Sequence, residues 1–311
     1  MIREQAYGVM VGAAVGDALG MPLEFGRPRR GQDQITEMIA GRLPAGTFTD
    51  DTEMALALGV SLADQGGFDA EDVTRRFIAW AEAGPADIGG QTSLALARQR
   101  RAMEQRKPIP PASGEWNSAG NGSIMRCFPA PLAYHDDLAE CLRVAVAQGE
   151  ITHPAADCAA GCRMMAAFIW HALRAHPAPA ALDQALSASL AAADDMDAEF
   201  RAMLENAPSR RAEELPNTGW VRHTLESAVW ALSTTADYAG CVIAAANLGG
   251  DADTSACVAG AMAGALYGLE GIPARWREQV RGEYPLHNGQ LWREAELIAL
   301  TARLIDISTI S

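Results

Sequence analysis

The chain has 311 residues, 49% of them apolar but only 6% aromatic, and carries 39 acidic against 25 basic residues for a formal net charge of −14. This length can bury a large core, and the negative charge argues against general binding to nucleic acids or anionic membranes, which need a basic face. Abundant Ala, Leu, Arg, Glu and Gln favour helices, and β-branched residues form no alternating runs typical of strands. The sequence therefore predicts an all-α protein.

In chain order, the first expected helix covers residues 6–19 and has Gly8, Gly12 and Gly16 one turn apart. Because glycine weakens a helix, this spacing predicts close packing of backbones, and the expected helix near the C-terminus repeats it. Residues 26–48 are rich in Gly, Arg and Pro and predict an exposed loop. No linker or fixed repeat divides the chain, so we expect a single domain over 1–311. The remaining helices are expected at 52–65, 69–82, 91–105, 136–149, 154–175, within 179–215, and at 220–232, 237–247, 254–268 and 289–306.

The six cysteines lie in apolar segments, and none forms a Cys-x-x-Cys pair: Cys127, Cys141, Cys158, Cys162, Cys241 and Cys257. This distribution predicts buried free thiols and a reducing cytoplasmic environment. The first residues do not resemble a signal peptide, and we expect no apolar run long enough to span a bilayer. We therefore expect a cytoplasmic monomer.

Two acidic stretches have the same design, Thr49-Asp50-Asp51-Thr52 and Asp251-Ala252-Asp253-Thr254. Each follows a glycine-containing loop and begins an apolar, alanine-rich helix. Carboxylate and hydroxyl oxygens suit Mg²⁺ or Mn²⁺, and converging carboxylates repel unless cations or protons neutralise them. Capping of its own helix explains a single pair at least as well. The occurrence of two such pairs favours one shared site for two ions.

Three further features are candidates for a site. Glu24 lies among apolar residues, where an unpaired carboxylate is costly, so it is either capped locally or turned toward a cation. Residues 116–126 are polar and then abruptly apolar, and successive backbone N–H groups in such a turn can bind an anion. A plain loop before a helix explains this stretch equally well. His153, next to Pro154, is compatible with a simple turn residue.

Taken together, these motifs resemble the ADP-ribosylglycohydrolase (ADP-ribosyl-hydrolase) family, which includes the dinitrogenase reductase-activating glycohydrolases and the ADP-ribosylarginine hydrolases. The resemblance covers almost the whole chain and implies a single-domain orthogonal helix bundle with a dinuclear metal cleft for two Mg²⁺ or Mn²⁺ ions. The motifs that carry it are Gly16-Asp17-Ala18-Leu19-Gly20 with Glu24, Thr49-Asp50-Asp51-Thr52, Gly120-Asn121-Gly122-Ser123-Ile124-Met125-Arg126, Thr152-His153 and Gly250-Asp251-Ala252-Asp253-Thr254.

The resemblance also implies individual roles. Glu24 matches a glutamate at the rim of the metal site, His153 a histidine near the substrate, and Asp87, in Asp87-Ile88-Gly89, a catalytic aspartate of the arginine-specific branch. Gly90 and Trp220 lie toward the leaving group, where many nitrogenase-regulating relatives have Asn and Tyr. The implied metal ligands are Thr49, Asp50, Asp51, Asp251, Asp253 and Thr254, and the implied diphosphate-binding loop contains Ser118, Gly120, Asn121, Gly122 and Ser123.

The function implied is metal-dependent removal of mono-ADP-ribose from arginine side chains, with an ADP-ribosylated protein or small molecule as substrate and ADP-ribose as product. Cleavage of serine-linked ADP-ribose or of a small ADP-ribosylated molecule is the alternative chemistry. A non-catalytic ADP-ribose-binding module is the alternative class, although Asp87 and the metal ligands are all present. The sequence leaves open whether Asp87 or Glu24 transfers the proton.

Overall fold

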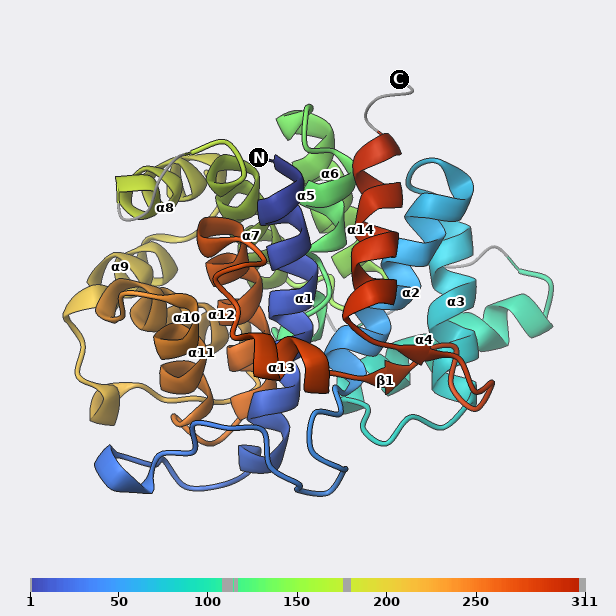
Figure 1. Ribbon diagram of the computed structural model, residues 1–311. Coiled ribbons are helices and arrows are strands. Elements are labelled where there is room, and N and C mark those ends of the chain that lie inside the picture. Colours follow the sequence, from blue (N-terminus) through green and yellow to red (C-terminus); the bar gives the residue numbers. More distant parts are fainter. Residues whose placement is uncertain (1, 108–113, 115–116, 176–179, 308–311) are drawn as a thin grey trace.

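The computed structural model describes residues 2–107, 114, 117–175 and 180–307. The first residue of the predicted anion-binding stretch, 116, and the first residue of the predicted segment 179–215 lie outside these ranges. Within them the chain is helical with one very small sheet, as the sequence predicts (Figure 1). The helices are α1 Ile2–Gly20, α2 Asp50–Gln65, α3 Ala70–Glu82, α4 Gly90–Glu104, α5 Pro129–Ala133, α6 Leu138–Glu150, α7 Ala156–Ala172, α8 Ala180–Ala192, α9 Ala198–Asn206, α10 Val221–Thr234, α11 Tyr238–Ala246, α12 Ala252–Tyr267, α13 Ala274–Gln279 and α14 Glu294–Ile307.

Helices α1 and α12 form the centre of the bundle and lie side by side along their lengths (Figure 1). A Cβ atom added to Gly8, Gly12 or Gly16 would come within 2.0–2.5 Å of a backbone oxygen of α12. These partner oxygens step backwards along α12 as the glycines step forwards along α1, so the helices are antiparallel. The glycine spacing therefore permits backbone contact, as predicted, and it brings the end of α1 beside the start of α12.

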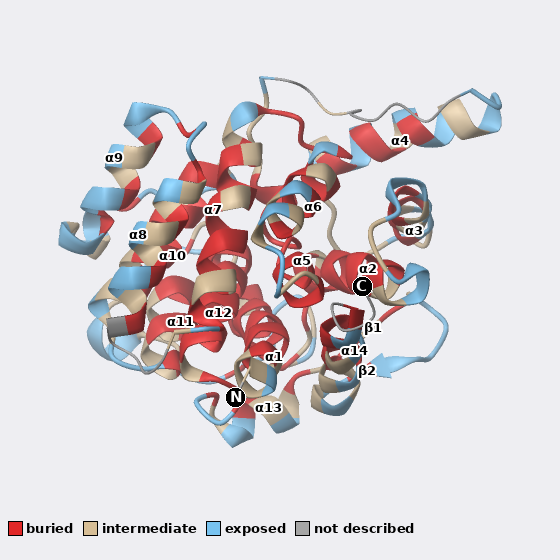
Figure 2. Ribbon diagram, turned by 90° about the horizontal axis from the view of Figure 1, so that it is seen from above, coloured by how far each residue is buried: buried red, intermediate tan, exposed pale blue. Residues whose placement is uncertain are grey.

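The interior is continuous and apolar, and in Figure 2 the buried residues concentrate in α1, α12, α7, α5 and α2. The six cysteines are buried free thiols, as predicted. An 18-residue window within Ile2–Leu23, which is α1 with the turn that follows it, has a mean hydropathy of 1.3, so this segment is long and apolar enough to cross a membrane by length and composition. The prediction that no such run exists was therefore wrong. Since 89% of this window is buried inside the protein, its apolar character is explained by packing in the core.

The structure corrects the predicted C-terminal helix. Residues 289–293 do not belong to it, because β2 Leu291–Trp292 pairs antiparallel with β1 Gly282–Glu283 and the helix begins at Glu294. Helix α14 begins only after this hairpin, where the Glu296 carboxylate accepts a hydrogen bond of 2.9 Å from the backbone N–H of Arg293. Strands of two residues are too short to produce a periodic signal in the sequence. The short helices α5 and α13 were missed for the same reason.

The segment predicted as an exposed loop, 26–48, is exposed over much of its length, but Met38 and Phe48 are buried. The Phe48 ring packs directly against Gly282 of β1, where a Cβ atom would collide with it. This contact fixes the chain immediately before α2 and so helps to position the first acidic stretch. The starts of the helices predicted at 69–82 and 237–247 are confirmed: the Asp69 and Asp237 side chains accept hydrogen bonds from the first turns of α3 and α11.

Candidate metal centre and active site

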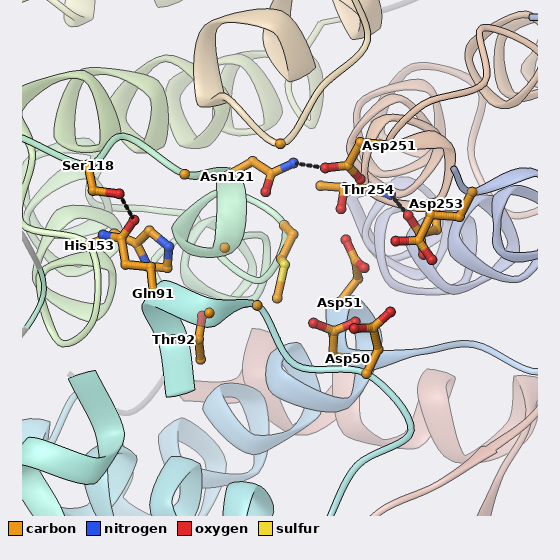
Figure 3. Close-up of a pocket in the computed structure, with 18 of the residues that line it drawn as sticks. Asp50, Asp51, Gln91, Thr92, Ser118, Asn121, His153, Asp251, Asp253 and Thr254 are labelled. Atoms are coloured by element: carbon orange, nitrogen blue, oxygen red, sulfur yellow. Dashed lines mark hydrogen bonds between the residues drawn. The ribbon is translucent and has the colours of Figure 1, made fainter. Parts of the chain in front are cut away.

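The two acidic stretches converge at one end of a cavity of about 350 Å³. Because α1 and α12 are antiparallel, Glu24, which follows α1, lies near Asp251 and Asp253 at the start of α12. Carboxylate oxygens of these three residues all lie within 4.8 Å of one another. The start of α2 contributes Asp50 and Asp51 to the same end of the cavity, as Figure 3 shows. Side chains 200 residues apart in the sequence therefore form one acidic cluster.

Hydrogen bonds to the starts of their own helices explain only part of this cluster: Asp253 accepts one of 2.9 Å from the backbone N–H of Thr254 in the first turn of α12. The residues that cap α2 and α12, Thr49 and Asp251, make no capping hydrogen bond through their side chains. Asp51 is only 2% exposed, and its Oδ1 atom has no hydrogen-bond partner among the described residues. A buried carboxylate oxygen without a partner is costly. The donor set thus fits a hard cation, which would satisfy this oxygen.

The electrostatics lead to the same conclusion. Burial, and then the negative charges of neighbouring carboxylates, raise the pKa of Asp50, Asp51 and Asp253 well above its usual range. The neighbour with the largest effect is Asp87 for Asp50, Asp17 for Asp51, and Asp51 for Asp253. Divalent cations would neutralise these carboxylates and so remove the part of each pKa shift that comes from neighbouring negative charge.

Asp17, in the predicted motif Gly16-Asp17-Ala18-Leu19-Gly20, lies beneath the cluster. Its carboxylate is fully buried and accepts hydrogen bonds from the backbone N–H and the hydroxyl of both Thr49 and Thr52, at 2.6–3.1 Å. Four donors compensate a buried charge that would otherwise be unstable, although burial still raises the pKa of Asp17. Asp17 therefore ties α1 to the first turn of α2. The Thr49 hydroxyl, a predicted metal ligand, is engaged in this contact.

The opposite wall of the cavity contains the glycine-rich loop. In Figure 3, Asn121 lies between the carboxylates on one side and Ser118 and His153 on the other. The Asn121 side chain donates hydrogen bonds to Asp251 (2.9 Å) and to Thr224 (3.0 Å), so it joins the loop to the acidic cluster. The Ser118 hydroxyl donates to Gln91 at 2.8 Å.

The base of this loop is fixed by Arg126, whose side chain is completely buried. Its guanidinium donates to the Gly122 carbonyl (2.7 Å), to the side chain and backbone of Gln148 and to the Thr152 hydroxyl (2.8 Å). It also lies 4.5 Å from the centre of the Phe77 ring. Burial lowers the pKa of Arg126 to about 10, so the side chain remains charged near neutral pH.

His153 is neutral in this environment, because burial and the nearby charge of Arg126 lower its pKa to about 3. Its Nδ1 lies 2.7 Å from the Thr152 hydroxyl. Since Arg126 donates to that hydroxyl, Thr152 can donate its own proton to Nδ1, which assigns the ring proton to Nε2. The ring packs against Gly122, where a Cβ atom would lie 2.7 Å from it.

The rim of the cavity contains the two predicted acid/base residues. The Glu24 side chain is 9% exposed and that of Asp87, in the turn before α4, is 31% exposed. Arg42 from the 26–48 loop forms ion pairs with both and also lies 3.5 Å from Asp253. Phe25 lines the cavity beside Glu24 and is 82% exposed.

Most of the predicted site residues therefore surround one cavity: Glu24, Asp50, Asp51, Asp87, Ser118, Gly120, Asn121, Gly122, His153, Asp251, Asp253 and Thr254. Thr49, Ser123 and Trp220 are not among the described residues that line it. The cavity is also lined by residues without a role predicted from the sequence: Phe25, Gln91, Thr92, Met125 and Gly219. The role of Asp17 was not predicted either, although a single carboxylate in the otherwise apolar run 6–20 was a usable signal.

The structure is thus an all-α bundle in which carboxylates and a glycine-rich loop face each other across a cavity, an arrangement typical of a binding or active site. The sequence profile of the ADP-ribosylglycohydrolase family matches residues 1–307, and the chain belongs to this family of glycosidases. It is 32% identical to the ADP-ribosylarginine hydrolase Tri1 of Pseudomonas putida (strain GB-1), over 89% of this chain and 74% of that protein. It is also 32% identical to the ADP-ribosyl-[dinitrogen reductase] glycohydrolase of Rhodospirillum rubrum, over 88% and 90% of the two chains.

The solved structure of an ADP-ribosylglycohydrolase-related protein complex matches with a TM-score of 0.80 and 33% identity, covering 99% of both chains. The predicted fold of the family is thereby confirmed over nearly the whole chain.

Proposed function

We propose that this protein is a metal-dependent hydrolase that removes mono-ADP-ribose from arginine side chains by cleaving the C1″ N-glycosidic bond. The observation that carries the proposal is the convergence of carboxylates from α2, α12 and the rim along one wall of a cavity, opposite a glycine-rich loop. The names of the two relatives, an ADP-ribosylarginine hydrolase and a glycohydrolase of ADP-ribosylated dinitrogen reductase, support the arginine linkage.

The residues that would hold metal are Asp50, Asp51, Asp251, Asp253 and Thr254, with Glu24 at the edge and Thr49 as a further predicted ligand. Their oxygen donors, and the unpaired Asp51 oxygen, suit Mg²⁺ or Mn²⁺. Two such cations would supply Lewis-acid chemistry that neutralises charge and orients the distal ribose and a water molecule.

The chain's own residues would bind and orient the rest of the substrate. The loop from Ser118 to Ser123 would contact the diphosphate through backbone N–H groups, as such turns do with anions. Asn121, bound to Asp251, keeps this loop at a fixed position relative to the acidic cluster. Neutral His153 supports the loop from behind Gly122. These contacts would hold the reacting carbon at the carboxylates, and such orientation lowers a reaction barrier.

Asp87 would act as the general acid/base, because the guanidine has to leave in its protonated form. Its carboxylate lines the cavity and is partly exposed, so it can exchange protons with solvent. Glu24 is the other residue placed for this role. We also propose that the protein acts as a monomer in the cytoplasm, where its free buried cysteines would remain reduced.

The test is incubation with peptides carrying mono-ADP-ribose on arginine or on serine, with Mg²⁺, Mn²⁺ or excess EDTA, and detection of free ADP-ribose by mass spectrometry. We expect release from the arginine peptide only when a divalent cation is present. Faster release of ADP-ribose from the serine peptide would indicate that the protein cleaves the serine linkage instead. ADP-ribose binding without release from either peptide would indicate a binding module.

A further inference from the structure

The acidic rim of the cavity already binds a guanidinium group, and the chain itself supplies it. The Arg42 guanidinium pairs with Glu24, with Asp87 at 2.9 Å and more distantly with Asp253 at 3.5 Å. A planar guanidinium with five N–H donors is well matched to carboxylates on two sides. The substrate's leaving group has the same chemistry as the Arg42 side chain.

A second feature of the rim is independent of these ion pairs. Phe25 has φ 59°, in the left-handed region that a bulky side chain rarely adopts. Its backbone N–H donates to the Gly250 carbonyl at 2.6 Å, which holds this conformation next to the start of α12. The consequence is that an aromatic ring lines the cavity while remaining 82% exposed. Strained backbone of this kind is concentrated at ligand-binding sites, and an exposed aromatic face attracts guanidinium groups.

We propose that Glu24, Asp87 and Phe25 form the subsite for the guanidinium of the modified arginine, and that Arg42 occupies this subsite until the substrate displaces it. The inference rests on the proposed arginine linkage. The carboxylates bind the N–H groups of the guanidinium, and the Phe25 ring covers its face. Arg42 is thus an internal competitor for the leaving-group position.

Displacement of Arg42 does not require the core to open. Its side chain is 30% exposed, and it belongs to the largely exposed segment between Glu24 and Thr49. A ligand that binds only when Arg42 has left shows an apparent affinity reduced by the fraction of time the subsite is free. If Arg42 occupies the subsite for nine tenths of the time, removing it strengthens binding of a guanidinium about tenfold.

The experiment uses the Mg²⁺-saturated full-length protein and titrates methylguanidinium, followed by ligand-observed NMR. Arg42→Ala is compared with wild type and with Arg30→Ala, a matched control from the same loop whose ion pair with Glu213 lies on the surface. Methylammonium is titrated in parallel, because it gains from the removed positive charge but has no planar set of donors. Thermal unfolding of each variant checks that it is folded.

We expect methylguanidinium to bind Arg42→Ala about tenfold more tightly than wild type or Arg30→Ala, with a much smaller gain for methylammonium. Adding Phe25→Ala or Asp87→Asn to Arg42→Ala should reverse most of the gain. Equal affinities for Arg42→Ala and Arg30→Ala, or equal gains for both cations, would overturn the inference.

This outcome is separable from that of the proposed function. Release of ADP-ribose from arginine peptides together with unchanged methylguanidinium binding in Arg42→Ala refutes only the role of Arg42. A tenfold gain in binding without any release supports the subsite and refutes the hydrolase proposal.

Discussion

The inner end of the cavity and its rim are built in opposite ways. At the inner end, the carboxylates lie at the starts of α2 and α12. The positions of these two helices are set by the backbone contact of α1 with α12 and by the four hydrogen bonds to Asp17. At the rim, Arg42 and Phe25 are exposed side chains on irregular segments. An inner end that is buried and held by many contacts suits chemistry that requires fixed geometry. An exposed rim suits the selection and release of a leaving group.

The largest effect is expected at the inner end. Asp251→Ala removes a proposed metal ligand and the acceptor of the Asn121 hydrogen bond, so hydrolysis should fall below detection, as it should for wild type in excess EDTA. The readout is release of ADP-ribose from an arginine peptide. Full activity of a protein shown by metal analysis to be free of divalent cations would contradict the assignment.

At the rim, Asp87→Asn keeps the size of the side chain but removes its ability to exchange a proton near neutral pH. We expect kcat to fall about 10²–10⁴-fold, the usual effect of losing a positioned acid or base, with much less change in ADP-ribose binding. Steady-state kinetics provide the measurement. A kcat within a few-fold of the wild-type value would indicate that Glu24 or water, and not Asp87, transfers the proton.

The helix contact beneath the inner end can be broken without touching the cavity. In Gly16→Val the new Cβ would lie 2.0 Å from the Ala256 carbonyl oxygen, a backbone atom that cannot move alone. We expect a loss of about 3 kcal/mol in the free energy of unfolding, measured with urea. Gly90→Ala is the matched control, because no atom lies within 4 Å of its added Cβ. Equal stability of the two variants would show that α1 and α12 are not in backbone contact.

These contrasts also explain what could be predicted from the sequence. Helix-favouring composition and the glycine spacing of α1 are local signals, and they predicted the helices and their close packing. The two acidic stretches were found because each is a compact motif. The partners of Asp17 depend on how α1 packs on α2, and the place of Arg42 depends on an irregular loop, so neither follows from spacing along the chain. The roles of the cavity residues in binding and catalysis stay predictions.

The smallest expected effect concerns pH. The pKa of His153 is about 3 in the folded protein and about 6.5 in an unfolded chain, so below pH 6.5 the unfolded state binds one more proton and stability falls as pH falls. Between pH 7.5 and 5.5 this costs about 1.4 kcal/mol. His153→Gln should lose that much less stability over the same interval in urea titrations. An unchanged pH dependence in His153→Gln would mean that His153 is not held neutral.

The most direct test of the central claim, that the two acidic stretches form one dinuclear site, is the stoichiometry of Mn²⁺ binding, measured by calorimetry on metal-free protein and counted by electron paramagnetic resonance. We expect two ions for each chain in wild type. We also expect Asp51→Ala, on α2, and Asp253→Ala, on α12, each to weaken binding of both ions. Two independent sites, each affected only by substitutions in its own stretch, or fewer than two ions in wild type, would contradict it.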